Sequence, residues 1–416
     1  MQKKHTYDII IPICKPDKSF TRVLEMLKKQ DPAPQKIILL ETLEDGESFT
    51  PYPGCEVVVV RKYEFDHAST RRLGVSYSSA EAFIMMTQDA IPVDTKLCAR
   101  LLEGLYAWEK EERKPQKNLR NDMEKIISAY RNSIPSNSFG AGEFHEDRLR
   151  LVTSMDMRKK RRKMKSMPPI DSTVDMEPDT SSWDNVPCEQ YVKLIREHER
   201  RSESYPALPD GRIAMCYARQ IARKSAPEIE KFIRTFNYPD KSFVKSARDI
   251  NTLGIKAFFA SNVCCAYNRD LYESIMGFEP NAIFNEDMLY AAKALRHGYL
   301  VAYAADAKVV HSHEYSALQQ FRRNFDNGMS QAMHPEIFDK IRAEGEGKKL
   351  VKKAAIHLLK SGKGFQIIRL VWQSGWKYLG FRLGRKYRKL SYSAIHRYSM
   401  NKTYVEKHLR SHKPKK

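Results

Sequence analysis

The sequence predicts an α/β fold, and three observations support this prediction. Short apolar, β-branched runs alternate with stretches of helical spacing through the first hundred residues. The hydrophobic content of 42% suits a globular core, and a length of 416 residues allows two domains or one large domain with additions. A repeated strand–helix–strand order favours parallel βαβ units over separate sheets and bundles.

The first part of the chain contains the clearest repeats. We predict helices at residues 19–29 and 70–80 and strands at residues 7–13, 36–42, 56–60 and 82–89. The first helix has apolar residues at helical spacing, with Asp17 or Ser19 as its N-cap. This alternation of strands and helices is typical of a parallel sheet of the nucleotide-binding type.

The same pattern returns after residue 210. We predict a helix after Glu286 and strands at residues 212–218, 258–267, 301–303 and 307–313. Residues 1–105 and 210–335 should therefore form one domain. The stretch 106–209 between them is rich in charge and in Pro, Asp and Ser, and is predicted to be an insertion, partly helical and partly disordered. Its basic run at 158–163 is either a nucleic-acid or lipid contact or, as we favour, a solvated charged segment.

The positive charge is concentrated near the C-terminus. Residues 345–416 hold 20 Lys and Arg against Glu346 and Glu406, a net charge of +18, whereas the 52 basic and 49 acidic residues elsewhere give only +3. Basic residues alternate with Trp, Phe and Leu at helical spacing over residues 348–389. The segment 336–416 is therefore predicted to be a basic, aromatic-rich helical tail. Such a tail suits an anionic membrane surface, and the alternatives are packing on the core or a nucleic-acid contact.

Other features bear on the cellular compartment. We find no charge-free run of 18 residues and no apolar signal-peptide core near Met1, so we expect no spanning helix. The seven Cys include no CxxC pair, and the adjacent Cys264 and Cys265 do not suit a disulfide framework. These observations predict a cytoplasmic protein, and the basic tail predicts a peripheral position at the inner face of the cell membrane.

Acidic residues follow apolar runs at two points. Asp89 ends the predicted strand at 82–89, and Glu286 and Asp287 precede an Ala-rich helical segment. Ligands of open α/β sheets bind at the carboxyl ends of strands, so Asp89 is placed to bind a divalent cation and Asp287 to act as a general base. For the acid pair the alternative is a helix N-cap without a catalytic role.

Histidine and arginine residues complete the candidate site. We expect either His311 or His313 to supply a second metal ligand, although a His-x-His pair by itself is more often structural. Arg71 opens a helix, where it can contact phosphate, unless it is a surface residue like Arg72. Arg322 and Arg323 are further candidates for phosphate or acceptor contacts, or else belong to an ordinary charged helix face.

Five motifs in a fixed order resemble the family-two glycosyltransferases. They are IIPI at 10–13, FDHASTRRLG at 65–74, TQDAIP at 87–92, GF at 277–278 with NED at 285–287, and VHSHEYS at 310–316. Within that family the chain is most similar to bacterial rhamnosyltransferase-like enzymes of cell-wall or capsular polysaccharide assembly. The resemblance covers roughly residues 5–105 and 210–335 and leaves out the insertion and the tail.

The resemblance implies a GT-A fold and inverting transfer of a sugar from a nucleoside-diphosphate donor to a glycan or lipid-linked acceptor. It implies that Asp287 of the Glu286–Asp287 pair is the catalytic base, and that a cofactor, Mg²⁺ or Mn²⁺, binds Asp89 with His311 or His313. The implied donor-binding residues are Pro12, Glu41, Thr42, Arg71, Gln88 and Asp89. The chain departs from the family pattern at Thr87, which stands where an Asp-x-Asp motif has its first acid.

Two other classes of function are compatible with parts of the sequence. A metal-dependent phosphohydrolase would use Asp89, Asp287 and the histidines, but it would need more clustered ligands than the sequence shows. A non-enzymatic nucleic-acid- or membrane-binding protein is suggested by the net charge of +21. Nucleic acid is disfavoured as a partner, because the excess charge lies in the tail and the rest of the chain is nearly balanced.

Overall fold

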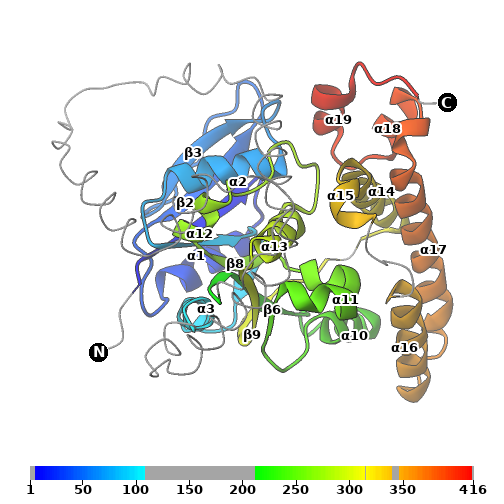
Figure 1. Ribbon diagram of the computed structural model, residues 1–416, viewed down its shortest axis with the longest axis horizontal. Helices are drawn as coiled ribbons and strands as arrows, with labels where there is room; N and C mark the ends of the chain where they lie inside the picture. Colours follow the sequence, from blue (N-terminus) through cyan, green and yellow to red (C-terminus); the bar gives the residue numbers. More distant parts are fainter. Residues whose placement is uncertain (1–4, 108–210, 314, 340–345, 415–416) are drawn as a thin grey trace, which may run out of the picture. The chain divides into compact units, whose positions relative to one another are not determined.

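The computed structural model describes residues 5–107, 211–313, 315–339 and 346–414. Their strands form one mixed sheet with the order β3-β2-β1-β4-β8-β6-β9-β5, and β7 pairs with β9 at its side (Figure 1). The strands are β1 (Tyr7–Ile13), β2 (Ile37–Leu43), β3 (Glu56–Arg61), β4 (Ala82–Met86), β5 (Ile91–Pro92), β6 (Ile213–Ile221), β7 (Phe243–Lys245), β8 (Cys264–Asn268) and β9 (Leu300–Val310). The α/β prediction is confirmed.

Helices cover both faces of this sheet. The helices of the α/β part are α1 (Ser19–Lys28), α2 (His67–Ser76), α3 (Leu97–Leu105), α10 (Glu228–Asn237), α11 (Ile250–Leu253), α12 (Arg269–Ser274) and α13 (Glu286–Arg296), with the 3₁₀ helices η1 (Ala247–Asp249) and η2 (Gly254–Phe258). Ile9 and Ile11 of β1 pack in one core with α1 and α3, while Ile10 packs in another with α2, α12 and α13. A strand with apolar residues on both faces must be covered twice, which explains the continuous apolar runs.

The first four strands run parallel, and the sheet becomes mixed beyond them. β1 pairs in parallel with β2 and β4, and β2 with β3, as the βαβ rhythm predicts. β8 is antiparallel to both β4 and β6, while β6 and β9 are parallel to each other. The carboxyl ends of β1, β2 and β4 therefore meet at one edge, where the chain continues into the candidate site residues.

The structure differs from the sequence prediction at three places. The run at 258–267 was expected to be one strand, but β8 begins only at Cys264, because η2 ends at Phe258 and an irregular stretch with a turn at 262–263 follows it. The predicted helix 70–80 begins earlier, at His67, where Asp66 caps it by accepting hydrogen bonds from the backbone N–H groups of Ala68 (3.1 Å) and Ser69 (2.7 Å). The two strands expected at 301–303 and 307–313 are a single strand, β9, with a bulge.

The chain after residue 316 is helical, and its part from 336 onward is the predicted helical tail. The helices are α14 (Ala317–Met333), α15 (Pro335–Phe338), α16 (Glu346–Lys360), α17 (Gln366–Arg385), α18 (Tyr392–Tyr398) and α19 (Lys402–Leu409), with the 3₁₀ helix η3 (Tyr387–Lys389). None of the helices in the described part of the chain is long and apolar enough to cross a membrane. The predicted insertion lies outside the described residues from position 108 to 209, and so does its basic run at 158–163. The predicted domain boundaries stay predictions.

Glycines hold α17 tightly against α14, and Figure 1 shows the two helices side by side. Gly380 and Gly384 of α17 face the carbonyl oxygens of Phe321 and Phe325, and Gly328 of α14 faces that of Phe381. A methyl group at any of these three positions would overlap backbone atoms of the other helix. The close contact makes α17 an integral part of the packed structure.

We expect Gly384→Ala to lower the free energy of unfolding by about 1–3 kcal/mol, because the two helices must separate to accept the new methyl group. The matched control is Gly375→Ala on the same helix, where nothing lies within 4 Å of the added carbon. That control should be neutral or stabilising by up to about 1 kcal/mol, since alanine favours helix. Urea unfolding of both variants measures the difference, and equal stabilities would contradict the tight α14–α17 contact.

Candidate functional site

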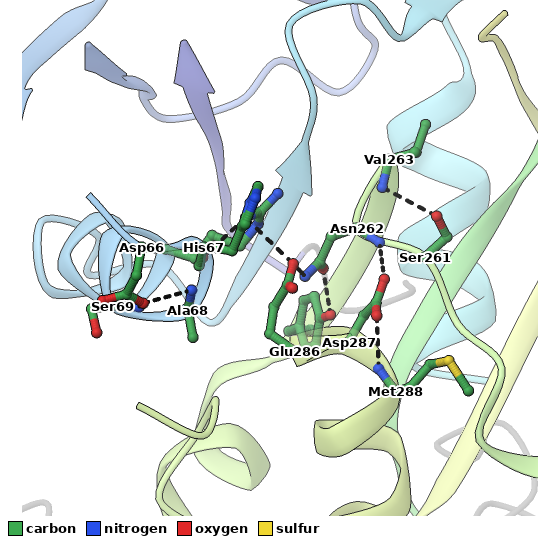
Figure 2. A network of polar contacts seen from close by, with 12 residues as sticks. Asp66, His67, Ala68, Ser69, Ser261, Asn262, Val263, Glu286, Asp287 and Met288 are labelled. Atoms are coloured by element: carbon green, nitrogen blue, oxygen red, sulfur yellow. Dashed lines mark hydrogen bonds and ion pairs between the residues drawn. The ribbon is translucent and has the colours of Figure 1, made fainter. Parts of the chain in front are cut away.

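The two predicted catalytic acids lie at the first turn of α13, after Asn285 in a left-handed conformation (φ 65°). The carboxylate of Asp287 accepts hydrogen bonds from the backbone N–H groups of Asn262 (3.0 Å) and Met288 (2.8 Å). Figure 2 shows both contacts, with Asn262 next to the two acids. Asp287 is thus held in one orientation by backbone groups from two segments.

Glu286 has a different set of partners. Its carboxylate accepts a hydrogen bond from the side-chain amide of Asn262 (3.0 Å) and pairs with Arg71 (3.3 Å), whose side chain is only 7% exposed. The hydroxyl of Tyr267 donates to the amide oxygen of Asn262 (2.6 Å) and so orients that amide. A buried carboxylate is stable only when it is paired and hydrogen-bonded, and Arg71 and Asn262 meet this requirement.

These surroundings separate the pKa values of the two acids. Burial would raise the pKa of Glu286, but the charges of Arg71 and His67 outweigh it and lower that pKa. Burial and the negative charge of Glu286 raise the pKa of Asp287 to about 7. Two neighbouring acids with separated pKa values are typical of acid–base sites, because one stays charged while the other exchanges a proton near neutral pH.

Arg71 was expected to contact a diphosphate. In the structure its guanidinium pairs with Glu286 and donates to the backbone oxygen of His67 (2.9 Å). This arrangement makes Arg71 a support of the acid pair. Its contact with a diphosphate stays a prediction.

The predicted metal ligands come together at the end of β9. Asp89 lies 3.3 Å from Nε2 of His311 and 3.0 Å from Nε2 of His313, and one ligand atom from each residue lies within 4.8 Å of the others. We expected only one histidine to face the site, but both do. Side chains two residues apart in an extended segment point to the same face, which the expectation overlooked.

The three side chains fit a divalent cation. Burial would raise the pKa of Asp89, but hydrogen bonds from His311 and His313 outweigh it and hold that pKa well below its usual range, so the carboxylate is charged. Nδ1 of His311 lies 2.9 Å from the side-chain oxygen of Gln220, which also accepts a hydrogen bond from Arg234. Gln220 thus provides an acceptor for Nδ1 of His311, and a bound cation would take the place of the proton that Nε2 shares with Asp89.

The two centres share one segment of chain, residues 261–263. Asn262 binds both acids, while the hydroxyl of Ser261 accepts a hydrogen bond from the side chain of Gln220 (2.8 Å), the partner of His311. The oxygen of Val263 accepts from the N–H of Thr87 (3.2 Å), two residues before Asp89. The acid pair and the Asp89–histidine cluster thus belong to one site.

The predicted donor-binding residues lie at the carboxyl ends of neighbouring strands. Gln88 follows β4 and bonds the backbone of Cys14 twice, at 2.8 and 3.3 Å, just beyond β1. In β2, Glu41 accepts from the N–H of Thr50 (2.9 Å) and pairs in register with Ile13. Pro12 is half-buried in β1, and the hydroxyl of Thr42 is buried without a hydrogen-bond partner. The fold brings the set together, and its role in donor binding stays a prediction.

Arg323 extends the site from α14. Its guanidinium lies over the rings of Phe284 (4.7 Å) and Tyr315 (5.8 Å), and Tyr315 stacks on His313 with ring centroids 4.9 Å apart. Phe284 directly precedes the segment of the acid pair, so Arg323 lies near both centres. Arg322 is half-buried, and its Nε atom has no hydrogen-bond partner.

Sequence reasoning missed the supporting residues of this network, among them Gln220, Asn262 and Tyr267. Ser261 and Asn262 interrupt an apolar run, and that interruption was a usable signal. Gln220 and Tyr267 lie in buried strands, and their roles depend on contacts with residues far away in the sequence.

Comparison with known proteins identifies glycosyltransferases as the class with similar sequences. No protein-family model matches the chain. Over 196 residues it is 42% identical to the O-antigen chain rhamnosyltransferase RfbN of Salmonella typhimurium strain LT2 and 39% identical to the O-antigen chain rhamnosyltransferase WbaN of Salmonella anatum. Each match covers 47% of this chain and 62% of the relative, less than two thirds of either protein. The predicted resemblance to rhamnosyltransferase-like enzymes is confirmed over this stretch.

Solved structures give more distant similarities. The mannosyltransferase PcManGT from Pyrobaculum calidifontis, in complex with GDP-Man and Mn²⁺, matches with a TM-score of 0.40 and 11% identity, over 99% of this chain and 89% of its own. Residues 1–349 of S. aureus TarS match with a TM-score of 0.36 and 12% identity, over 98% and 92%.

Proposed function

We propose that this protein is an inverting glycosyltransferase that moves a sugar from a nucleoside-diphosphate donor to a glycan or lipid-linked acceptor. The observation that carries the proposal is the pairing of two chemically distinct centres through residues 261–263. One is an acid with a pKa of about 7, Asp287, and the other is the cation-binding set of Asp89, His311 and His313. Similarity to two O-antigen rhamnosyltransferases supports rhamnose as the sugar.

In the proposed reaction Asp287 takes the proton from the acceptor hydroxyl. The oxygen then forms a bond to the anomeric carbon on the face opposite to the donor phosphate, and the bond between that carbon and the diphosphate oxygen breaks. The nucleoside diphosphate leaves with the electron pair. A base with a pKa near the working pH is suited to this step. Glu286 remains charged and keeps Arg71 in place beside it.

The Asp89–histidine cluster would hold the cofactor, Mg²⁺ or Mn²⁺. A bound divalent cation offsets the negative charge of the leaving diphosphate. Two imidazole nitrogens with one carboxylate favour Mn²⁺, since Mg²⁺ prefers oxygen ligands. Pro12, Glu41, Thr42 and Gln88 would line the nucleotide pocket, and Arg323 would contact phosphate between the two centres.

A lipid-linked acceptor would also give the basic tail a role. The acceptor would be reached at the inner face of the cell membrane, where anionic lipids attract a segment with a net charge of +18. We therefore propose a peripheral, cytoplasmic location for the enzyme.

Donor binding tests the proposed function directly. We expect one member of a panel of dTDP-, UDP- and GDP-sugars to raise the melting temperature of the protein in the presence of Mn²⁺. At a donor concentration 100 times the Kd, binding adds about 2.7 kcal/mol of stability. The same donor should then yield a glycoside with an acceptor in place of the free sugar that a hydrolase would release. No shift with any donor, or release of free sugar with acceptor present, would contradict the proposal.

A further inference from the structure

Large apolar side chains are exposed along one face of α16 and α17. They include Leu359 (62% exposed), Phe365 (75%), Ile368 (79%), Trp372 (62%), Tyr378 (64%) and Leu379 (46%). We call this set the outer face. Single exposed apolar residues are ordinary in proteins, but a contiguous apolar surface marks an interaction site.

The outer face follows from two stripes of residues on α17. Ile368, Trp372, Gly375 and Leu379 recur at intervals of three and four residues and are exposed. The opposite stripe contains Leu370, Gly380 and Gly384, which are buried, and its two glycines face the backbone of α14. Since α14 packs on the glycine stripe and on Trp376, the side chains of the outer face stay exposed in the described structure.

The charges around the outer face favour an anionic partner. Residues 347–405 contain no Asp or Glu, and Lys352, Lys360, Arg369 and Arg382 are exposed on the same two helices. Basic residues near an anionic bilayer strengthen binding, while Trp and Tyr prefer the interface between headgroups and hydrocarbon. Aliphatic side chains such as Ile368 and Leu379 gain from hydrocarbon and have no comparable partner on a phosphodiester backbone. The chemistry of the outer face thus fits a lipid surface better than nucleic acid.

The helix α14, which packs on the opposite side of α17 from the outer face, contacts the segment of the acid pair. The hydroxyl of Ser330 in α14 donates to the backbone oxygen of Phe284 (2.6 Å). The side chain of Asn327 in α14 accepts from the side-chain amide of Asn285 (2.8 Å), the residue directly before the helix of the acid pair. Because α14 also contacts the glycines of α17, this one helix connects α17 to the segment that carries Glu286 and Asp287.

We propose that the outer face of α16 and α17 binds the surface of an anionic lipid bilayer and, through α14, holds the acid pair at a fixed position relative to that surface. The lipid contact stands on the outer face alone, while its purpose, access to a lipid-linked acceptor, rests on the proposed function. Binding would be interfacial, since no helix among the described residues spans a membrane.

Vesicle co-sedimentation of the full chain tests the contact. We expect wild type to bind vesicles of phosphatidylcholine with about a third phosphatidylglycerol, and to bind pure phosphatidylcholine at least tenfold more weakly. The triple variant Ile368→Ser, Trp372→Ser, Leu379→Ser should bind at least tenfold more weakly with an unchanged melting temperature, because these side chains are exposed.

A charge-reversed variant tests the basic residues. Arg369→Glu with Arg382→Glu should weaken binding to the anionic vesicles only. The matched control, Phe49→Ser with Val244→Ser, removes exposed apolar groups elsewhere and should bind as wild type.

Three outcomes would overturn the proposal. The first is failure of wild type to bind anionic vesicles, and the second is full binding by the triple variant. The third is release of the wild-type protein from the vesicles when a single-stranded oligonucleotide is added as a competitor. The assay contains neither donor nor acceptor, so its result is independent of sugar transfer. Asp287→Asn should bind vesicles as wild type does, which separates failure of the lipid contact from failure of the proposed function.

Discussion

Asp287→Asn is expected to lower the rate of sugar transfer by a factor on the order of 10²–10⁴, the usual contribution of a general base. Asparagine keeps the shape of the side chain and an oxygen for the N–H of Asn262, but it cannot accept a proton. The affinity for the nucleotide donor should not change, because Asp287 acts on the acceptor. Single-turnover transfer with saturating donor, together with a donor titration by thermal shift, measures both quantities.

The pH profile of wild type should report the same group. The pKa of Asp287 is about 7, so the base form is scarce at pH 5 and predominates at pH 8. The transfer rate is therefore expected to rise tenfold per pH unit well below pH 7 and to level off above it. This rise should be absent from the residual activity of Asp287→Asn.

The matched control is Glu273→Gln, an acid-to-amide change in α12. Glu273 is exposed and pairs only at the surface, with Arg269 (3.2 Å). Its transfer rate and pH profile should equal those of wild type. The melting temperature of Asp287→Asn should stay close to that of wild type, because the change removes repulsion between two buried acids but also the hydrogen bond from the N–H of Met288. Full turnover by a folded Asp287→Asn enzyme would contradict the assignment of the base.

The parts of the fold that the sequence predicted are those determined by local pattern. The run at 7–13 is β1, and its uninterrupted apolar character follows from burial on both faces of the sheet. Asp89, Asp287 and the histidines follow apolar runs, but only the fixed order of five motifs resembling the family-two glycosyltransferases favoured them over structural roles. The predicted ranges of most strands were close to the observed ones. The local error at 258–267 arose where Asn262 turns toward the acids.

The remaining features depend on contacts between distant residues. The antiparallel pairing of β8 with β4 and β6 is not encoded in the β8 sequence alone. Gln220 lies 91 positions from His311, and Arg71 lies more than 200 from Glu286, so neither pairing has a local signal. The spacing of Gly380 and Gly384 could be read in the sequence, but the helix that they contact could not.

Asp89→Ala is expected to weaken Mn²⁺ binding by at least about 100-fold. Removing a group that only supports a metal ligand already lowers metal affinity by about 10–100-fold. Asp89 is itself a predicted ligand and the one acid of the set. Calorimetric titration of Mn²⁺ into the protein saturated with nucleoside diphosphate measures the change without relying on catalysis. The Mn²⁺-dependent part of donor stabilisation should disappear with it.

The neighbouring acid Asp94 provides a matched control. It pairs with Arg100 at the surface (2.8 Å), five residues from Asp89, and so Asp94→Ala removes a carboxylate of the same type from the same stretch of chain. This variant should bind Mn²⁺ as wild type does. If Asp89→Ala also kept wild-type Mn²⁺ affinity, the cluster with His311 and His313 would be a structural ion pair. Charge on the leaving diphosphate would then have to be offset by arginine, and Arg323, which lies over the rings of Phe284 and Tyr315, would be the residue to replace next.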